Sequence, residues 1–104
     1  MSAERLESLK RMVEQNPGDS FLRYALAIEY RNAGDLERAV GEFRALLATN
    51  PEYGPAYYQG GQTLERLGRL GEAREMYREG VALTTRKGDQ HARGEMQAAL
   101  DLLG

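Results

Sequence analysis

The sequence predicts an all-α protein in which about six short helices pair into antiparallel hairpins. Three observations lead to this prediction. Segments of the 104-residue chain return at a constant offset of 34 residues, and a period of this length is typical of stacked helical repeats. Apolar residues recur at helical spacing within each segment, without strand-like alternation. Proline or glycine stands at the end of most segments, where these residues stop helices.

The repeated pattern is clearest between residues 33 and 51. A shift of 34 residues toward the C-terminus places glycine on glycine in a turn, and then matches leucine, alanine and aromatic positions. A shift in the other direction gives a weaker match with residues 1–17. The aligned pairs are Gly34 with Gly68, Leu36 with Leu70, Ala39 with Ala73, Phe43 with Tyr77, Leu47 with Val81, Leu9 with Phe43, and Val13 with Leu47.

The first helix is expected over residues 3–15 and the second over residues 20–33. Pro17 separates them, because the residue before a proline is disfavoured in the helical region. Asp19 or Ser20 can then cap the second helix by accepting bonds from its free N–H groups. This second helix is apolar around almost its whole circumference. It is therefore expected either to lie centrally in the core or to line a site that something else covers.

The third helix is expected over residues 36–49. Gly34 can close the preceding helix in the left-handed conformation, and Asp35 can cap the new one. The fourth helix is expected from Pro55 to about Leu67, because proline is well suited to the first helical turn.

The fifth helix is expected from about Leu70, and Gly88 and Asp89 then form a stop and a cap before the sixth. Gly60 and Gly61 lie inside the fourth helix, where each glycine costs roughly 1 kcal/mol relative to alanine. Either a neighbouring backbone or ring needs the space, or the pair is a tolerated weak turn. The sixth helix places an apolar face against the preceding hairpin, formed by Met96, Ala99, Leu100 and Leu103.

With these residues in place, the chain resembles the tetratricopeptide repeat family. The resemblance implies a short right-handed α-solenoid. It divides the chain into a half-repeat helix (1–17), a first repeat (20–53), a second repeat (54–87) and a C-terminal capping helix (88–104). The matching residues are Leu26, Ala27, Tyr30, Gly34, Ala39, Phe43 and Pro51 in the first repeat, and Tyr57, Gly61, Gly68, Ala73, Tyr77 and Val81 in the second. The departures are Arg23, Leu46, Gly60, Leu64, Gly80 and Thr85.

Composition argues against an enzyme, a cofactor or a metal site. The chain has no Cys and a single His, His91, and it lacks a glycine-rich phosphate loop or a nucleophile elbow. Its 14 basic and 16 acidic residues are interleaved and leave a net charge of -2, which is typical of a solvated helix surface rather than a nucleic-acid binder. No signal-like or membrane-spanning segment is seen, so a cytoplasmic protein is expected.

The resemblance also implies a binding site. In this family the first helices of successive units line a concave groove that takes peptides or helices from partners. Tyrosine and arginine, which are enriched at binding hot spots, fall on these positions here. The alternative is that the large apolar residues of the second helix are core residues, covered by the last helix of the chain. The expected groove residues are Phe21, Tyr24, Ile28, Arg31, Tyr58, Gln62, Glu65 and Arg66, flanked by Ala25, Asn32 and Gln59.

One subclass of the family grips the C-terminal tails of chaperones through a clamp of lysine and asparagine. The positions that would carry this clamp are Tyr24, Ile28 and Gln59, which have the wrong chemistry for a carboxylate, so this partner class is not expected. The sequence therefore predicts a non-enzymatic module that binds a protein or peptide segment, with an adaptor or assembly role. The rival hypothesis is a structural homo-oligomer. The polar outer faces of the first and last helices favour a monomer, because terminal caps need such faces.

Overall fold

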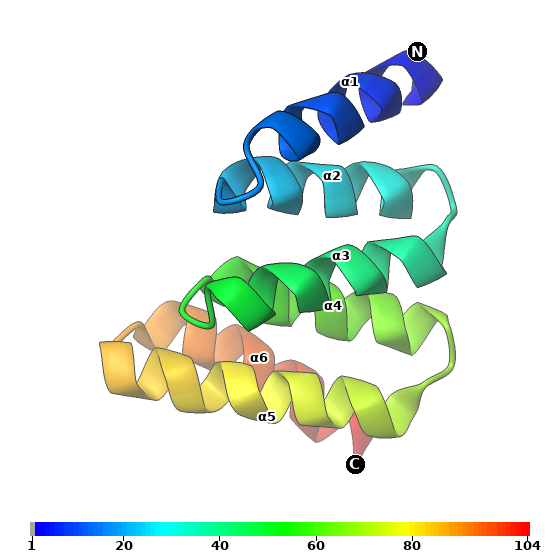
Figure 1. Ribbon diagram of the computed structural model, residues 1–104. Coiled ribbons are helices and arrows are strands. Elements are labelled where there is room, and N and C mark those ends of the chain that lie inside the picture. Colours follow the sequence, from blue (N-terminus) through cyan, green and yellow to red (C-terminus); the bar gives the residue numbers. More distant parts are fainter. Residues whose placement is uncertain (1) are drawn as a thin grey trace. The chain divides into compact units, whose positions relative to one another are not determined.

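The computed structural model describes residues 2–104, and side chains from residue 3 onward. These residues form six α-helices without strands (Figure 1). The chain divides into two compact units, unit 1 (Met1–Tyr53) and unit 2 (Gly54–Gly104), which are described separately. Unit 1 holds α1 (Ser2–Gln15), α2 (Ser20–Asn32) and α3 (Leu36–Thr49), and unit 2 holds α4 (Gly54–Arg66), α5 (Leu70–Lys87) and α6 (Gln90–Leu103). The predicted all-α hairpin fold is confirmed, with helix ends within one or two residues of those expected.

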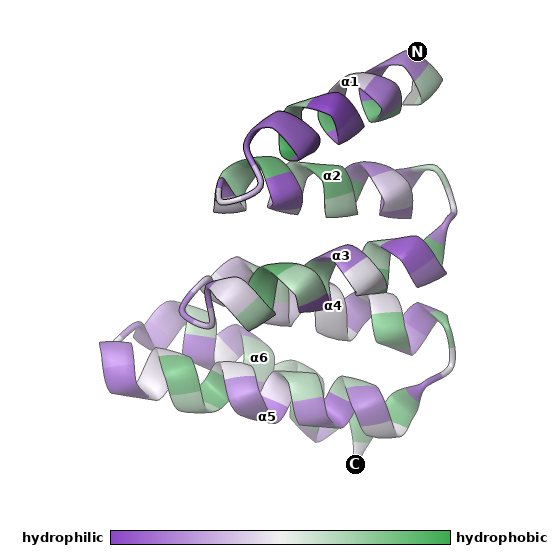
Figure 2. Cartoon of the chain, viewed as in Figure 1, coloured by the Kyte–Doolittle hydropathy of each residue, from purple (hydrophilic) through white to green (hydrophobic). Residues whose placement is uncertain are grey.

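In unit 1, α2 packs against both α1 and α3. The apolar side of α1 is the side toward α2 (Figure 2). Leu26, Ala27, Ala39 and Phe43 are buried, and the small alanines let the helices approach closely. Arg23 stands where the repeat pattern prefers tryptophan, and its Nη1 forms an ion pair of 2.9 Å with Oε1 of Glu42 on α3.

In unit 2, α5 packs against both α4 and α6. Its side chains supply much of the core, and Tyr77 is fully buried. Met96 of α6 is also buried, at 1% exposure, and approaches Gly80 of α5. Of the four residues predicted to cover the preceding hairpin, Met96 is therefore confirmed as buried, whereas Ala99, Leu100 and Leu103 are half-buried. Thr85 does not shorten α5, because the helix continues to Lys87 and ends at Gly88.

The two glycines Gly61 and Gly80 make room for large side chains inside unit 2. A Cβ atom on Gly61 would clash with the Tyr77 ring, lying only 2.7 Å from its Cδ1 and Cζ atoms. A Cβ atom on Gly80 would lie 2.8 Å from the Tyr57 Cβ and 3.0 Å from the Met96 Cε. Of the two explanations offered for glycine at position 61, the need of a neighbouring ring for space is the right one.

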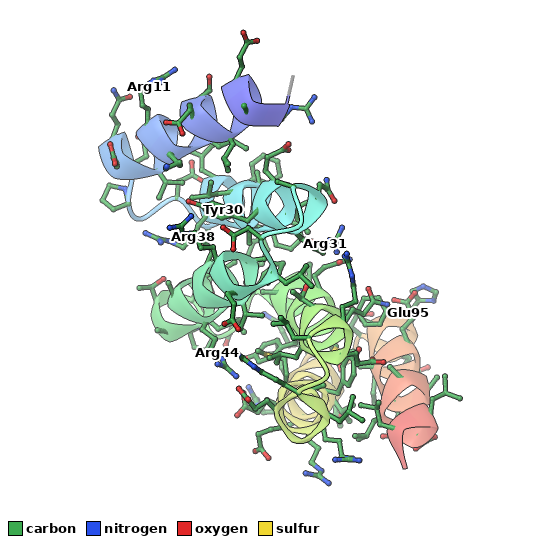
Figure 3. The ribbon with its side chains drawn as sticks, turned by 90° about the vertical axis from the view of Figure 1, so that its right-hand side faces the viewer. Arg11, Tyr30, Arg31, Arg38, Arg44 and Glu95 are labelled. Carbon is green, nitrogen blue, oxygen red and sulfur yellow. The ribbon has the colours of Figure 1, made fainter. Side chains whose placement is uncertain are left out.

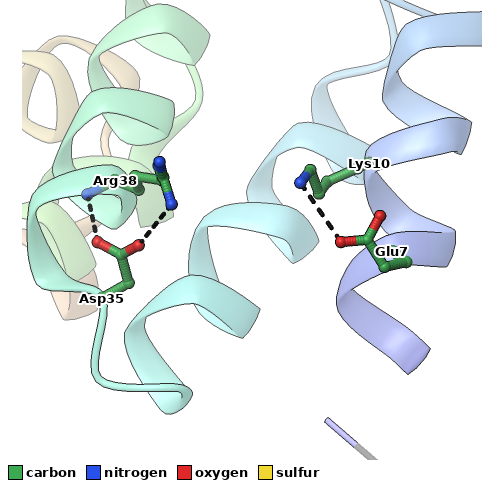
Figure 4. Close-up of polar contacts among 4 residues, drawn as sticks. All are labelled: Glu7, Lys10, Asp35 and Arg38. Atoms are coloured by element: carbon green, nitrogen blue, oxygen red, sulfur yellow. Dashed lines mark hydrogen bonds and ion pairs between the residues drawn. The ribbon is translucent and has the colours of Figure 1, made fainter. Parts of the chain in front are cut away.

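Aspartates cap three of the helices, as the sequence predicts. The carboxylates of Asp19, Asp35 and Asp89 accept hydrogen bonds from the backbone N–H groups of α2, α3 and α6, three residues further on. Asp35 also pairs with the side chain of Arg38, and a similar pair joins Glu7 and Lys10 on α1 (Figure 4). Gly34, Gly68 and Gly88 adopt the left-handed conformation between helices, with φ of 87°, 78° and 73°.

The N-terminus of α5 departs from this capping pattern. Arg69 occupies the N-cap and its side chain makes no capping hydrogen bond, although the aligned residue 34 positions earlier is Asp35. We expect Arg69→Asn to raise the free energy of unfolding by about 0.5–1 kcal/mol, because asparagine accepts a bond from the first turn and the change removes a positive charge from the positive end of the helix dipole. Asparagine avoids placing a second carboxylate near Glu72.

Thermal or urea unfolding measures this effect, and Asp35→Ala serves as the matched control. That change should destabilise the protein by about 0.5–2 kcal/mol, because it removes a cap that is present. An Arg69→Asn protein less stable than wild type would show that Arg69 contributes more through other contacts than a cap would.

Candidate functional site

A hollow of about 460 Å³ lies between α1 and α2 in unit 1. One end is apolar and open to solvent, because the side chains there are unusually exposed for their type: Phe21 is 67% exposed and Met12 is 44% exposed. Large apolar residues at such exposure mark interaction surfaces when they gather in a concave place. The lining residues are Arg5, Ser8, Leu9 and Met12 from α1 and Phe21, Tyr24, Ala25, Ile28, Glu29 and Asn32 from α2.

Tyr24 lies between this hollow and the core of unit 1. Its ring meets the buried Phe43 edge-on, with 6.0 Å between ring centres, and lies 5.3 Å from the ring of Tyr53. Burial raises the pKa of the Tyr24 hydroxyl, with a further contribution from Tyr53 and an opposing one from Arg31. The phenol is therefore neutral at physiological pH, and Tyr24 offers a ligand an apolar ring and an uncharged hydroxyl.

The other end of the hollow is polar. The carboxylate of Glu29 is 7% exposed and forms a long ion pair, 3.5 Å, with the guanidinium of Arg5, which is itself 66% exposed. An ion pair of this length, with one partner in solvent, compensates a buried carboxylate only weakly. Glu29 is therefore suited to accept a further donor from a ligand.

Unit 2 has two hollows between α4 and α6, of about 350 and 410 Å³. Both are lined by Tyr58 of α4 and Glu95 of α6, and Figure 3 shows Glu95 on α6. The linings of the two hollows combine small apolar residues with acidic ones. The first hollow also involves Gly54, Pro55, Gln59, Thr84, Asp89, Ala92 and Met96, and the second Gln62, Glu65, Ala98, Ala99 and Leu102.

Glu65 is tied to the core of unit 2. It accepts a short hydrogen bond from the hydroxyl of Tyr77. Burial raises the pKa of Tyr77 far above its usual value, and this bond to the carboxylate raises it further. The ring of Tyr58 lies 6.4 Å from that of Tyr77, so these three side chains form one connected group beneath the hollows. Glu65 therefore has a structural role that sequence reasoning did not predict.

The structure brings the predicted site residues together in two sets. Phe21, Tyr24 and Ile28 line the hollow of unit 1, and Tyr58, Gln62 and Glu65 line a hollow of unit 2. Gln62 and Glu65 also meet Arg66 in a smaller hollow of about 330 Å³. Arg31, which Figure 3 labels on α2, is half-buried and does not line any of these hollows. That both sets belong to one concave groove stays a prediction.

Sequence reasoning missed the contributions of the first and last helices, because it assigned them to capping alone. Met12 of α1 and Leu102 of α6 stand in the hollows, and Leu102 is 89% exposed. Met12 lies on the same side of α1 as Leu9, so nothing in the sequence distinguished it from a core residue.

Other chemistry is scarce in the part of the chain that the structure describes. No group of three or more His, Asp or Glu side chains is arranged there to hold a metal ion. His91 is exposed, and its Nε2 lies 3.8 Å from a carboxylate oxygen of Glu95. Among the helices of residues 2–104, none has the length and apolar character needed to cross a membrane.

Comparisons with known proteins agree with this architecture. A sequence model described as tetratricopeptide repeat matches residues 54–85. A TPR repeat-containing protein of Pseudomonas aeruginosa is 30% identical over 95 residues, which cover 91% of this chain and 90% of that protein. The solution structure of a tetratricopeptide repeat domain protein from Salinibacter ruber has a TM-score of 0.80 and 35% identity, and covers 85% of this chain and 89% of that one.

A more distant structure shows the same fold. The crystal structure of PcrH in complex with the chaperone binding region of PopD has a TM-score of 0.90 at 13% identity, and the match covers 98% of this chain and 77% of that one.

Proposed function

Because the chain belongs to the tetratricopeptide repeat family, whose members typically serve as non-enzymatic protein-interaction modules, we propose that it binds a peptide or helix of a partner protein. The single observation that carries the proposal is the exposed apolar lining of the α1–α2 hollow, where Phe21 is 67% exposed. In the related fold of PcrH, the bound element is a segment of another protein, the chaperone binding region of PopD. This mode of binding supports the proposal.

The binding surface in this proposal is a concave groove formed by Phe21, Tyr24, Ile28, Arg31, Tyr58, Gln62, Glu65 and Arg66. Its rings offer apolar area with little rotamer entropy to lose, and arginine offers a fork for carbonyl or carboxylate groups. A ligand with apolar anchors and mixed charge fits this lining. Micromolar affinity is expected, as for other small transient surfaces.

The proposed cellular role is that of an adaptor or scaffold, acting as a cytoplasmic monomer that does not bind nucleic acid. The net charge of -2 supports the last point, because nucleic-acid binders usually carry a basic patch or surplus. The competing role is that of a homo-oligomer. Sedimentation velocity separates the two, since only a self-associating chain changes its sedimentation coefficient with concentration.

The test is partner capture from the source cell by the wild type and by the double variant Ile28→Ser with Gln62→Ala. We expect capture to fall at least about tenfold, which corresponds to about 1.4 kcal/mol of binding free energy. These positions are preferred to Tyr24 and Tyr58, whose rings pack on the buried Phe43 and Tyr77. Replacing both tyrosines with alanine is also expected to abolish capture, but with a loss of stability.

Leu70→Ser is the matched control, because Leu70 is 42% exposed at the start of α5 and does not line any of the hollows described above. Circular dichroism and melting of each variant confirm that it is folded. If the folded double variant still captures the same partners as the control, the concave face is not the binding site.

A further inference from the structure

We propose that the hollow between α1 and α2 binds a single amphipathic helix of a partner protein. The bound helix would lie beside α1 and α2 as α4 lies beside α5 and α6 in unit 2. The proposal rests on the proposed function and names the kind of segment that is bound. The internal repetition of the chain supplies, within unit 2, a counterpart of the unit 1 hollow in which α4 lies against α5.

The first step is the correspondence of α1 with α5. When the helices are aligned at their first residues, Ser2 and Leu70, the four α1 residues of the hollow fall on four α5 residues. All four α5 residues are buried, and two of them, Tyr77 and Gly80, directly approach Gly61 and Tyr57 of α4. The aligned pairs are Arg5 with Ala73, Ser8 with Met76, Leu9 with Tyr77, and Met12 with Gly80.

The second step is the correspondence of α2 with α6. Aligned at their first residues, Ser20 and Gln90, which lie 70 residues apart and so two more than two repeat lengths, four α2 residues of the hollow fall on the α6 residues that share a hollow with α4. One side of the unit 1 hollow therefore repeats the α5 surface that packs on α4, and the other side repeats the α6 surface that shares a hollow with α4. The aligned pairs are Ala25 with Glu95, Ile28 with Ala98, Glu29 with Ala99, and Asn32 with Leu102.

The α1 side of the hollow leaves room for a bulkier helix than α4. Leu9 stands where unit 2 has Tyr77, the ring that allows only glycine at position 61. Because leucine is smaller than tyrosine, the bound helix accommodates alanine at this crossing. Met12 and Phe21 then supply apolar surface for its first turns, since they are 44% and 67% exposed at that end of the hollow.

The polar end of the hollow favours a positive charge on the bound helix. The bound helix runs parallel to α2, as α4 runs parallel to α6, so its last turn lies near Glu29. The carboxylate of Glu29 is 7% exposed and its ion pair with Arg5 is long, at 3.5 Å. A lysine or arginine in the last turn of the partner helix would place a second cation against this carboxylate. At the aligned position of α4 stands Glu65, which would repel it.

The experiment uses the full-length chain, labelled with ¹⁵N, and synthetic peptides with the sequence of residues 54–67 as probes. Each peptide carries Gly60→Ala and Gly61→Ala, which raise helicity because glycine costs roughly 1 kcal/mol per residue in a helix. One peptide keeps Glu65 and the other carries Glu65→Lys. We expect saturable shifts of amide signals in α1 and α2, with the lysine peptide binding at least about tenfold more tightly.

Three variants of the chain test the contacts. Glu29→Gln should remove the tenfold preference for the lysine peptide, and Met12→Ser with Phe21→Ser should weaken binding of both peptides at least about tenfold. Leu70→Ser, an exposed leucine outside the hollow, should leave binding unchanged. All altered side chains except Glu29 are more than two-fifths exposed, so the folded state should survive.

Three results of the peptide titration would overturn the inference. They are the absence of saturable binding, shifts confined to α4 and α6, and concentration-dependent shifts of α1 and α2 in the chain alone, which would make a second copy the occupant.

If the Met12→Ser, Phe21→Ser variant still captures the natural partner while Ile28→Ser, Gln62→Ala does not, this inference fails and the proposed function stands. If no variant affects capture, the proposed concave site fails as well.

Discussion

Tyr77→Ala is expected to lower the free energy of unfolding by about 3–5 kcal/mol, the usual cost of truncating a buried aromatic side chain. The ring is fully buried, and it fills the space left by the absent side chain of Gly61. Its hydroxyl donates to Glu65, so truncation also leaves that carboxylate without its bond. Because a small domain has only about 5–15 kcal/mol of stability in total, the variant should be largely unfolded at moderate temperature. Urea unfolding followed by circular dichroism measures the change.

The control is Tyr77→Phe, which keeps the ring and removes only the hydroxyl. It should cost about 1–2 kcal/mol, the scale of one hydrogen bond to a charged group. Phe43→Ala tests the aligned position in unit 1, where the ring is also fully buried, and should again cost about 3–5 kcal/mol. If Phe43→Ala melts within a few degrees of wild type, the repeat register that aligns Phe43 with Tyr77 is wrong.

The helices and their ends could be predicted from the sequence because local chemistry determines them. Asp19, Asp35 and Asp89 each bond to an N–H group only three residues away, and Gly34 and Gly88 need only their own freedom of φ. The 34-residue repeat predicted that Phe43 and Tyr77 lie in the core, because a repeat puts equivalent residues in equivalent surroundings.

The sequence offered room for a neighbour as one of two explanations for Gly61, but it did not predict which neighbour. The sequence showed that two adjacent glycines in a helix need a reason, but the Tyr77 ring that supplies it lies on the neighbouring helix. Which of several aromatic residues reaches that place depends on how two helices cross. The same holds for the bond from Tyr77 to Glu65, since sequence spacing alone does not show that residues on two helices meet.

The candidate site was predicted less well than the fold. Phe21, Tyr24 and Ile28 were expected at the site from the family resemblance, together with the surplus of apolar residues around α2. Met12 and Glu29 were missed, because their importance depends on exposure and burial rather than on residue type. A methionine on an amphipathic helix is normally core, yet Met12 is 44% exposed, and a glutamate is normally solvated, yet Glu29 is 5% exposed.

Deletion of residues 89–104 is expected to abolish the cooperative folding of unit 2. The deletion removes Met96, which is 1% exposed and lies against Gly80, where α5 has no side chain of its own to cover the site. It also removes the main-chain carbonyl groups of Leu103 and Gly104, which accept hydrogen bonds from Arg74. The flank of α5 around Gly80 would then face water, and exposed apolar surface of this kind leads to aggregation.

Size-exclusion chromatography and thermal unfolding measure the outcome, with two point variants for comparison. Met96→Ala should cost about 2–5 kcal/mol, because the cavity cannot be filled from the Gly80 side. Leu102→Ser, on the same helix but 89% exposed, should change stability by no more than about 0.5 kcal/mol. A deletion protein that remains monomeric and unfolds cooperatively would show that α6 is a detachable element. Its contact with α4 around Tyr58 would then matter for binding rather than for the stability of the fold.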